Sequence, residues 1–287
     1  MIEPQTSWLP RERSGVAFQF FAWAAAALLL LFLSLPFVAV LLRSSPREVL
    51  RHLTDSPVLD ALRLSLMTGL AATLAIVLLG TPAAYLLATR RFPGKRLIET
   101  LIDLPLVLPP TVAGFALLMA FGRLGLAGAA LRAAGISLPF TTAAVVVAQA
   151  FMAAPFYVAA ARAGFTAVDP SLVETAATLG ASEAGRFFRV LLPLARPLLV
   201  SGAAMSAARA LGEFGATITF AGNLPGTTQT MPLAVYVALQ SDLDTALVLS
   251  VVLLLASFGM LLALRSAPAG ALWGALDARA RGREAAR

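Results

Sequence analysis

Long apolar runs without charged residues constrain this chain more than any other feature of its sequence. A bilayer core about 30 Å thick is crossed by a helix of about 20 apolar residues. Runs of this kind cover residues 18–42, 64–89, 104–122, 136–161 and 245–264, and a sixth run, with two charges, covers 197–220. Backbone polar groups in lipid must bond within the chain, and no run alternates as barrel strands do. The sequence therefore predicts an all-α integral membrane protein with about six transmembrane helices.

The composition supports lipid as the main solvent of the folded chain. Hydrophobic residues make up 59% of the 287 residues and charged residues 13%, against about 45–50% and about 25% in soluble domains. Too few polar side chains remain to cover a soluble core of this size. The chain has no cysteine, and its only histidine, His52, has no accompanying set of metal ligands. We expect neither a metal site nor a catalytic nucleophile–base pair.

The basic residues orient the chain in the membrane. If the N-terminus is cytoplasmic, fifteen of the 22 Lys and Arg residues fall inside, six fall outside, and Arg209 lies within a run. Cytoplasmic segments carry the excess of Lys and Arg, so both termini are predicted to be cytoplasmic. The segment 221–244 has no basic residue and is predicted to be external. The arginines flank apolar runs and form no separate basic face, which argues against nucleic acid as a partner.

The cytoplasmic segment 168–193, called here the 168–193 loop, is too polar to enter lipid and is patterned for two short helices. Asp169 followed by Pro170 is typical of a helix N-cap and first helical position. Gly180 is typical of a helix end, and Ser182 can cap a second helix before the next span. Two capped helices joined by a tight turn predict a rigid projection that a partner can bind.

The same loop resembles that of binding-protein-dependent ABC importer permeases. Each permease subunit of that family carries the pattern E-A-A, three residues, G, nine residues, I-x-L-P. This chain matches both gaps and departs at two positions, with Glu174-Thr175-Ala176, then Gly180, then Val190-Leu191-Leu192-Pro193. The resemblance implies the type I ABC importer permease fold and a coupling helix that docks into a cleft on a separate ATPase.

Several residues are assigned to coupling by this resemblance. They are Asp169, Glu174, Ala176, Gly180, Leu192 and Pro193. Each also has a purely structural interpretation, since Ser171 to Glu174 fits a capping box and Gly180 fits a helix end. A docking helix must also be well capped, so the two interpretations are compatible.

Two further stretches, 104–114 and 207–236, resemble the molybdate permeases and their relatives, the sulfate permeases. The run Gly-Asn-x-Pro-Gly-x-Thr-Gln-Thr-x-Pro-Leu, which begins at Gly222, is more similar to the molybdate branch. The resemblance covers nearly the whole chain after Leu59. It implies translocation of molybdate or tungstate by alternating access, with sulfate or another oxyanion as the alternative.

Arg209 and Glu213 are the only charged residues well inside an apolar run. Four residues apart on a helix, they share a face and can pair. Charges within the membrane usually face the bundle interior or a cavity. The pair is therefore either a structural clamp or part of a translocation path or gate. With Gly222 and Asn223 of the external loop, these are the candidate path residues.

The chain is expected to form one permease domain with short flanks. Its predicted parts are an N-terminal cytoplasmic tail (1–17), a first span with its external loop (18–58), the core domain (59–265) and a C-terminal cytoplasmic tail (266–287). Six spans are half of what this importer class needs. The resemblance therefore implies a second copy of this chain, two ABC ATPase subunits on the cytoplasmic side, and an extracytoplasmic oxyanion-binding protein. ATP and Mg would belong to the ATPase, which leaves this chain no cofactor and no enzymatic activity, in a bacterial cytoplasmic (inner) membrane.

Two other classes of function remain open at this point. A secondary transporter would use Arg209 and Glu213 for ion coupling and need no ATPase, but it leaves the pattern over 174–193 unexplained. A membrane enzyme or an assembly scaffold would not transport a substrate. The missing catalytic cluster weighs against the enzyme.

Overall fold

The fold is built from helices alone within residues 16–52 and 55–266, the part of the chain that the computed structural model describes. In chain order the helices are α1 (Val16–Arg43), α2 (Pro46–His52), α3 (Ser56–Thr89), α4 (Lys95–Val107), α5 (Pro110–Phe121), α6 (Gly128–Ala133), α7 (Thr142–Thr166), α8 (Pro170–Thr178), α9 (Glu183–Arg186), α10 (Leu192–Leu211), α11 (Gly215–Phe220), α12 (Met231–Ser241) and α13 (Leu243–Ser266). A π-helical turn, Phe187–Leu191, joins α9 to α10. Most of the two predicted tails, 1–17 and 266–287, lies outside the described residues.

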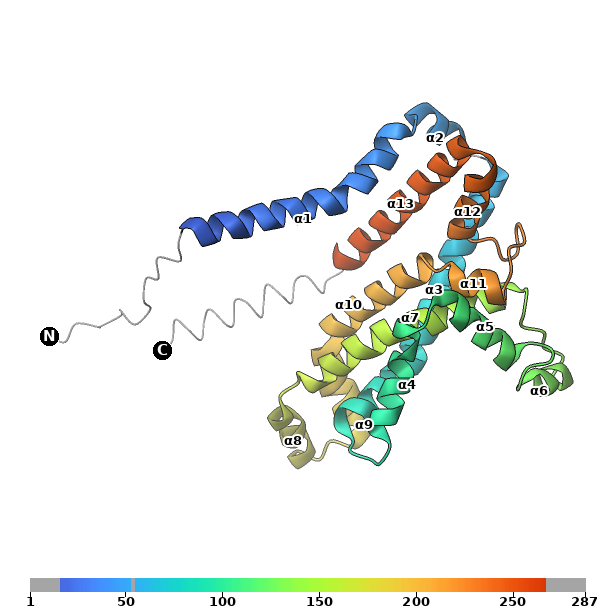
Figure 1. Cartoon of the computed structure of the whole chain (residues 1–287). Helices are drawn as coiled ribbons and strands as arrows, with labels where there is room; N and C mark the ends of the chain where they lie inside the picture. The colour runs from blue at the N-terminus through green and yellow to red at the C-terminus, as the bar shows by residue number, and fades with distance from the viewer. Residues whose placement is uncertain (1–15, 53–54, 267–287) are drawn as a thin grey trace.

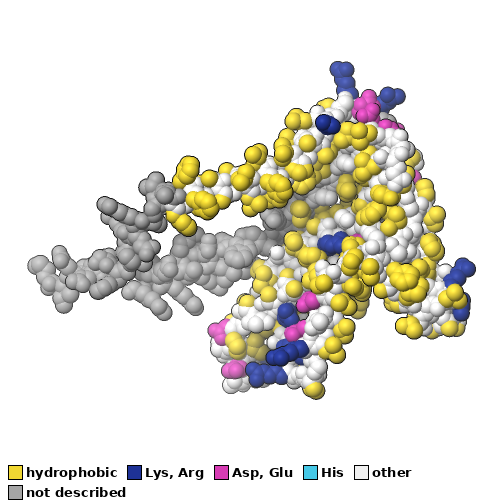
Figure 2. Space-filling view, viewed as in Figure 1, with side chains coloured by type: hydrophobic (Ala, Val, Ile, Leu, Met, Phe, Trp, Pro, Cys, Tyr) yellow, Lys and Arg dark blue, Asp and Glu magenta, His cyan; other side chains and the backbone are white. Residues whose placement is uncertain are grey.

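Five helices of the described chain are long and apolar enough to cross a membrane. They cover Phe18–Arg43, Ser56–Thr89, Thr142–Thr166, Glu183–Leu211 and Leu243–Ala263. The helices α5 and α12 are apolar but shorter. In Figure 2 most charged side chains gather at the lower end, around α8 and α9, or at the upper end, near α2, with hydrophobic surface between them. This distribution fits an apolar belt that faces lipid.

The predicted span over 104–122 is not one helix, because two prolines interrupt it. α4 ends at Val107 and α5 begins at Pro110. Between them Leu108 and Pro109 have ψ angles of 135° and 132°, which no helix accommodates. Proline has no N–H to donate, and its ring disfavours helical geometry in the residue before it. The third predicted span is therefore two helices that meet at an angle (Figure 1).

Other predicted spans are present with shifted ends. The run 136–161 becomes α7, which starts later because Thr141 caps it by accepting the N–H of Ala144 on its Oγ1 at 3.2 Å. The run 197–220 becomes α10 and the short α11, separated by a break at residues 212–214. The break is a second place where one apolar run is divided between two helices.

The centre of the bundle is formed by α3, α7 and α10, which approach closely because small residues lie where they touch. A Cβ added to Gly80 would lie 2.9 Å from Cδ1 of Tyr157, and one added to Gly202 would lie 2.7 Å from Cβ of Ala160. The hydroxyls of Thr81 and Tyr157 are 2.6 Å apart, which links α3 to α7 by a hydrogen bond. In lipid, close packing of small residues and hydrogen bonds between helices replace the hydrophobic drive to associate.

The short helices that follow the two breaks, α5 and α11, pack against each other at glycines. A Cβ added to Gly114 of α5 would lie 2.7 Å from the carbonyl oxygen of Ala216. One added to Gly215 of α11 would lie 2.7 Å from Cβ of Pro110. Irregular backbone at membrane depth is tolerated only where protein buries it or where it lines a cavity. The contact between α5 and α11 therefore protects both breaks.

α1 lies apart from the bundle and meets it mainly beside α13 (Figure 1). Its side chains are almost all exposed within the single chain, including Phe32 at 71% and Leu42 at 81%. An apolar helix that its own chain leaves uncovered must face lipid or another protein chain.

We expect Gly114→Val to destabilise the fold by about 2 kcal/mol, because overpacking a close contact typically costs roughly 1–3 kcal/mol. Thermal unfolding of the purified protein in detergent measures the effect as a lower Tm. Gly259→Val in α13 is the matched control, since a Cβ there meets nothing within 4 Å. Equal shifts in Tm for the two variants would contradict the close approach of α5 and α11.

Candidate functional site

The 168–193 loop contains the first short helix that the sequence predicts, and Asp169 caps it. Its Oδ1 accepts the backbone N–H of Ser171 at 2.9 Å, and Pro170 occupies the first helical position. This hydrogen bond lowers the pKa of Asp169 below its usual value. The cap is therefore ionised at neutral pH, and its contribution is lost only as the pH falls through that lowered pKa. A capping box from Ser171 is not formed, because Asp169 already holds the cap position.

Gly180 ends α8 in the left-handed conformation, as predicted, with a φ of +83°. The N–H of Gly180 donates to the carbonyl of Ala177, and the N–H of Ala181 donates to that of Ala176, both at 2.9 Å. These two bonds form a Schellman motif, which satisfies carbonyl groups at the end of a helix. No atom lies within 4 Å of where a Cβ would stand. Glycine is therefore required here for the backbone turn and not for close packing.

Ser182 caps the second short helix, as predicted, but that helix does not end before the next span. Its Oγ accepts the N–H of Gly185 at 3.1 Å. α9 then continues through the π-helical turn Phe187–Leu191 into α10, with Pro193 in the first turn of α10. The second arm of the loop is therefore the start of a membrane helix, and a displacement of α9 displaces α10.

The outer side of the loop is exposed within the single chain and includes large apolar side chains. Leu172 is 48% exposed, Phe188 63% and Leu179 82%. Among the predicted coupling residues, the exposed ones are Asp169, Glu174, Gly180 and Pro193, and the half-buried ones are Ala176 and Leu192. Exposed apolar groups on a charged cytoplasmic projection are typical of a surface that another protein covers.

The inner side of the loop is anchored to the bundle by an aromatic cluster. The ring of Tyr85 on α3 contacts Phe165 of α7 and Phe187 of the π-helical turn edge-on, with centroid distances of 5.9 and 4.9 Å. Phe165 and Phe187 are 6.0 Å apart. Val168 and Leu191, near the two ends of the loop, are buried in the same core. The loop is therefore fixed to α3 and α7 as well as to α10.

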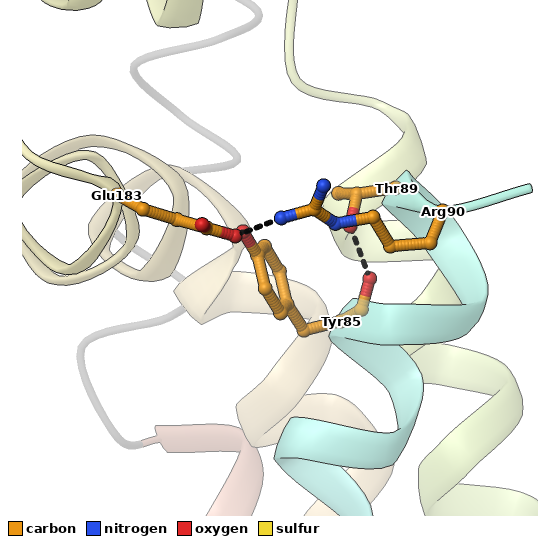
Figure 3. Close-up of polar contacts among 4 residues, drawn as sticks. All are labelled: Tyr85, Thr89, Arg90 and Glu183. Carbon is orange, nitrogen blue, oxygen red and sulfur yellow. Dashed lines mark hydrogen bonds and ion pairs between the residues drawn. The ribbon is translucent and has the colours of Figure 1, made fainter.

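An ion pair makes a second connection between the loop and α3 (Figure 3). Arg90, which follows α3, pairs with Glu183, the first residue of α9. The hydroxyl of Tyr85 donates to the same Glu183 oxygen at 3.4 Å. The hydrogen bond and the charge of Arg90 lower the pKa of Glu183, so the pair is charged at neutral pH. Both side chains are about half exposed, and the pair therefore orients the loop more than it stabilises the fold.

Tyr85, Arg90 and Glu183 are candidate functional residues that the sequence pattern does not identify. Arg90 and Glu183 are 93 positions apart in the chain. The only feature of the sequence that points to this ion pair is that opposite charges lie beside two helix ends predicted to be on the same side of the membrane. Several other cytoplasmic arginines share that property, so the partner of Glu183 is decided by the packing.

Arg209 and Glu213 form the predicted ion pair, with Nη2 of Arg209 2.6 Å from Oε2 of Glu213. The other carboxylate oxygen, Oε1, accepts the N–H of Ala216 at 2.8 Å and so fixes the start of α11. Because α10 ends at Leu211, Glu213 lies in the break and not on a continuous helix as predicted. The side chain of Glu213 is 1% exposed and that of Arg209 27%. A buried carboxylate thus holds a partly exposed guanidinium.

The external loop that contains Gly222 and Asn223 is folded back on itself. Gly222 has a φ of +74°, and a Cβ there would lie 2.9 Å from the ring of Phe140. The N–H of Leu224 donates to Oγ1 of Thr228 at 2.9 Å, and the carbonyl of Leu224 accepts the N–H of Thr228 at 2.9 Å. The loop therefore has a defined shape beside the start of α7.

The four predicted path residues occupy two separate places. Arg209 and Glu213 pair at the break between α10 and α11, whereas Gly222 and Asn223 follow the far end of α11. The six residues of α11 span about 9 Å. Within residues 16–52 and 55–266, no hydrogen bond or ion pair joins the two places directly.

The chain is similar to known transport proteins over most of its length. The family model described as "Binding-protein-dependent transport system inner membrane component" matches residues 76–265. The "Molybdenum transport system permease protein ModB" of Mycobacterium tuberculosis is 46% identical over 224 residues, which are 78% of this chain and 85% of that protein. The protein of the same name from Escherichia coli K12 is 43% identical over 190 residues, which are 66% of this chain and 82% of that protein.

Solved structures share the fold at much lower identity. A bacterial ABC transporter involved in the import of the acidic polysaccharide alginate matches with a TM-score of 0.69 at 13% identity, over 86% of this chain and 94% of that chain. The alginate transporter in complex with its alginate pentasaccharide-bound periplasmic protein matches with a TM-score of 0.68 at 14% identity, over 88% and 94%. At these identities the likeness shows the fold alone.

We expect Arg90→Glu to loosen the start of α9, because it places like charges side by side. Hydrogen–deuterium exchange of the purified protein should show faster exchange of the amides over 183–191. Combining Arg90→Glu with Glu183→Arg restores opposite charges and should restore protection. Arg91→Glu is the matched control, since this adjacent exposed arginine forms no ion pair within the described chain. Faster exchange that the double variant fails to reverse would refute the pairing.

Proposed function

Because the chain belongs to the family of binding-protein-dependent transport system inner membrane components, we propose that it is the membrane-spanning permease subunit of an ATP-driven molybdate importer. It is a multi-pass inner membrane protein. Relatives at 43% and 46% identity carry molybdenum transport in their names. This similarity supports molybdate as the substrate in preference to sulfate. Tungstate has the same charge and a similar tetrahedral shape, and competition experiments separate the two.

The construction of the 168–193 loop is the observation that carries the coupling role. Asp169 and Ser182 cap its two helices, and Phe187 anchors its inner side against α3 and α7. Its outer side remains exposed for a partner. An ATPase that binds this side moves α10 as a rigid body, because α9 is continuous with α10. The proposed coupling surface comprises Asp169, Glu174, Ala176, Gly180, Leu192 and Pro193.

Arg209 and Glu213 are proposed to lie at the path or its gate. A guanidinium suits a tetrahedral oxyanion, because its fixed donors bind two oxygens at once. A transport path must also release its substrate, so binding there has to be weak. The carboxylate of Glu213 competes with the anion for Arg209 and so weakens binding. Gly222 and Asn223 are proposed to belong to the outer end of the path.

The proposed permease domain covers residues 59–265, which contain the whole family match. We propose that it works with a second copy of this chain, two ATPase subunits that hold ATP and Mg, and an extracytoplasmic oxyanion-binding protein. The alginate transporter of the same fold has been solved with a periplasmic protein bound, which supports the last of these partners. The chain itself is proposed to be a transport subunit without enzymatic activity.

Molybdenum accumulation tests the proposed substrate. Cells that lack this gene, with and without the gene restored, are grown with scarce molybdate and excess sulfate. Restoration should raise cell molybdenum, and sulfate should not suppress the rise. Suppression by sulfate, or no rise at all, would overturn the molybdate assignment. Uptake that stops when the proton gradient is dissipated, but survives loss of the ATPase, would instead establish a secondary transporter.

We expect Gly180→Val to impair ATP-driven uptake without preventing membrane insertion. Valine at a φ of +83° is strained by roughly 1–2 kcal/mol, so the turn between the two short helices is distorted. Gly94→Val is the matched control, because Gly94 has a φ of +84°, is equally uncrowded, and lies in another cytoplasmic loop. Uptake should fall in the first variant and be retained in the second. Normal uptake by Gly180→Val would refute docking through this loop.

A further inference from the structure

Gln149 is a buried amide that the function proposed above does not use. It lies in α7, is 0% exposed, and neither its Oε1 nor its Nε2 has a hydrogen-bond partner in the described chain. A buried polar group without a partner destabilises a fold, and such groups are few in native proteins. Leucine would fill the same space without this penalty. The presence of glutamine therefore requires an explanation other than packing in this arrangement.

The residues around Gln149 in α7 pack near both α10 and α11. Residues three and four positions away share its face of α7. Two of them, Val145 and Met152, pack in the cluster that contains α11. The backbone carbonyl of a third, Ala153, accepts a hydrogen bond from the hydroxyl of Ser206 on α10 at 2.9 Å. The part of α7 that carries Gln149 thus packs against both the helix before the break and the helix after it.

Glu213, in this break, depends on Arg209 for charge compensation. Its Oε1 already accepts the N–H of Ala216. Its Oε2 lies 2.6 Å from Nη2 of Arg209 but not in hydrogen-bonding alignment, so Oε2 keeps an open acceptor position. A carboxylate that is 1% exposed is strongly destabilised when its counter-ion leaves. Arg209 can therefore turn toward a passing anion only if another donor takes its place.

We propose that Gln149 is the positioning residue that donates an N–H to Glu213 when Arg209 turns toward the oxyanion. Its Nε2 is without a partner in the described chain, and its helix packs against both α10 and α11, so a shift of α11 against α7 can bring donor and acceptor together. Exchanging one donor for the other keeps the buried carboxylate compensated while the guanidinium binds its anion. This inference rests on the proposed path role of Arg209.

Gln149→Leu tests the inference, because it removes the donor and retains the volume of the side chain. Replacing an unpartnered buried amide by an apolar group leaves the resting fold equally stable or more stable. We expect the Tm of the purified protein to stay level or rise. Molybdate uptake by cells should fall by about tenfold, the effect of losing one hydrogen bond to a buried charge.

A second variant tests whether Glu213 is the group that Gln149 serves. Glu213→Gln keeps Oε1 for the N–H of Ala216 but removes the charge, so Arg209 no longer needs a replacement. Uptake by Gln149→Leu combined with Glu213→Gln should therefore return to the level of Glu213→Gln alone. Met152→Leu is the matched control, since it lies one turn away, is buried, and is a volume-conserving change. It should leave both uptake and Tm near those of the wild type.

Two results would overturn the inference. The first is normal uptake by Gln149→Leu. The second is that Gln149→Leu lowers both uptake and the Tm, and that adding Glu213→Gln does not restore uptake. Gln149 would then be a structural residue. The proposed function is judged from the wild type alone. If the wild type takes up no molybdate, the proposed function fails and this inference fails with it. If the wild type transports and the variants do not differ as expected, only the inference fails.

Discussion

Lipid offers the backbone no hydrogen bonds, so every interruption of a membrane helix has to be enclosed by protein. The chain interrupts two of its apolar runs, at Pro109 and after Leu211. It brings these breaks together, because α5 and α11 meet through Gly114 and Gly215. Glu213 completes the arrangement by accepting the N–H of Ala216 at the start of α11 and by pairing with Arg209. The charged pair Arg209–Glu213 therefore lies where irregular backbone is shielded from lipid.

The 168–193 loop and the break at residues 212–214 lie at opposite ends of one helix, α10. α10 begins directly after the π-helical turn that contains Phe187, carries Arg209 in its last turn, and ends at Leu211, two residues before Glu213. Along its length it packs on α7 through small residues such as Gly202, and Ser206 adds a hydrogen bond between the two helices. The helical structure runs without a break from the end of the loop to Arg209. This continuity is the physical basis of the proposed coupling between a docked ATPase and the proposed path.

Features that depend on neighbours in sequence were predictable, and features that depend on distant segments were not. The caps at Asp169 and Ser182 and the turn at Gly180 follow from residue types within a few positions of one another. The pairing of Arg209 with Glu213 is local as well. In contrast, the ion pair between Arg90 and Glu183 joins segments 93 positions apart, and Gln149 is buried in a helix that packs against both α10 and α11. The charge and hydrophobicity of a residue indicate what kind of contact it makes, but they do not indicate which distant residue makes that contact.

The sequence by itself determined that much of this protein lies in lipid. It also determined the number and approximate places of the apolar runs and the capped loop between two of them. These properties follow from hydrophobicity, helix length and local backbone preferences, which act within about one helix. Only the tertiary structure decided that the run 197–220 divides after Leu211, and that this break and the break at the prolines after Val107 are both covered by the contact between α5 and α11. It also decided that Glu213 is buried, and burial is what makes its charge depend on its partners.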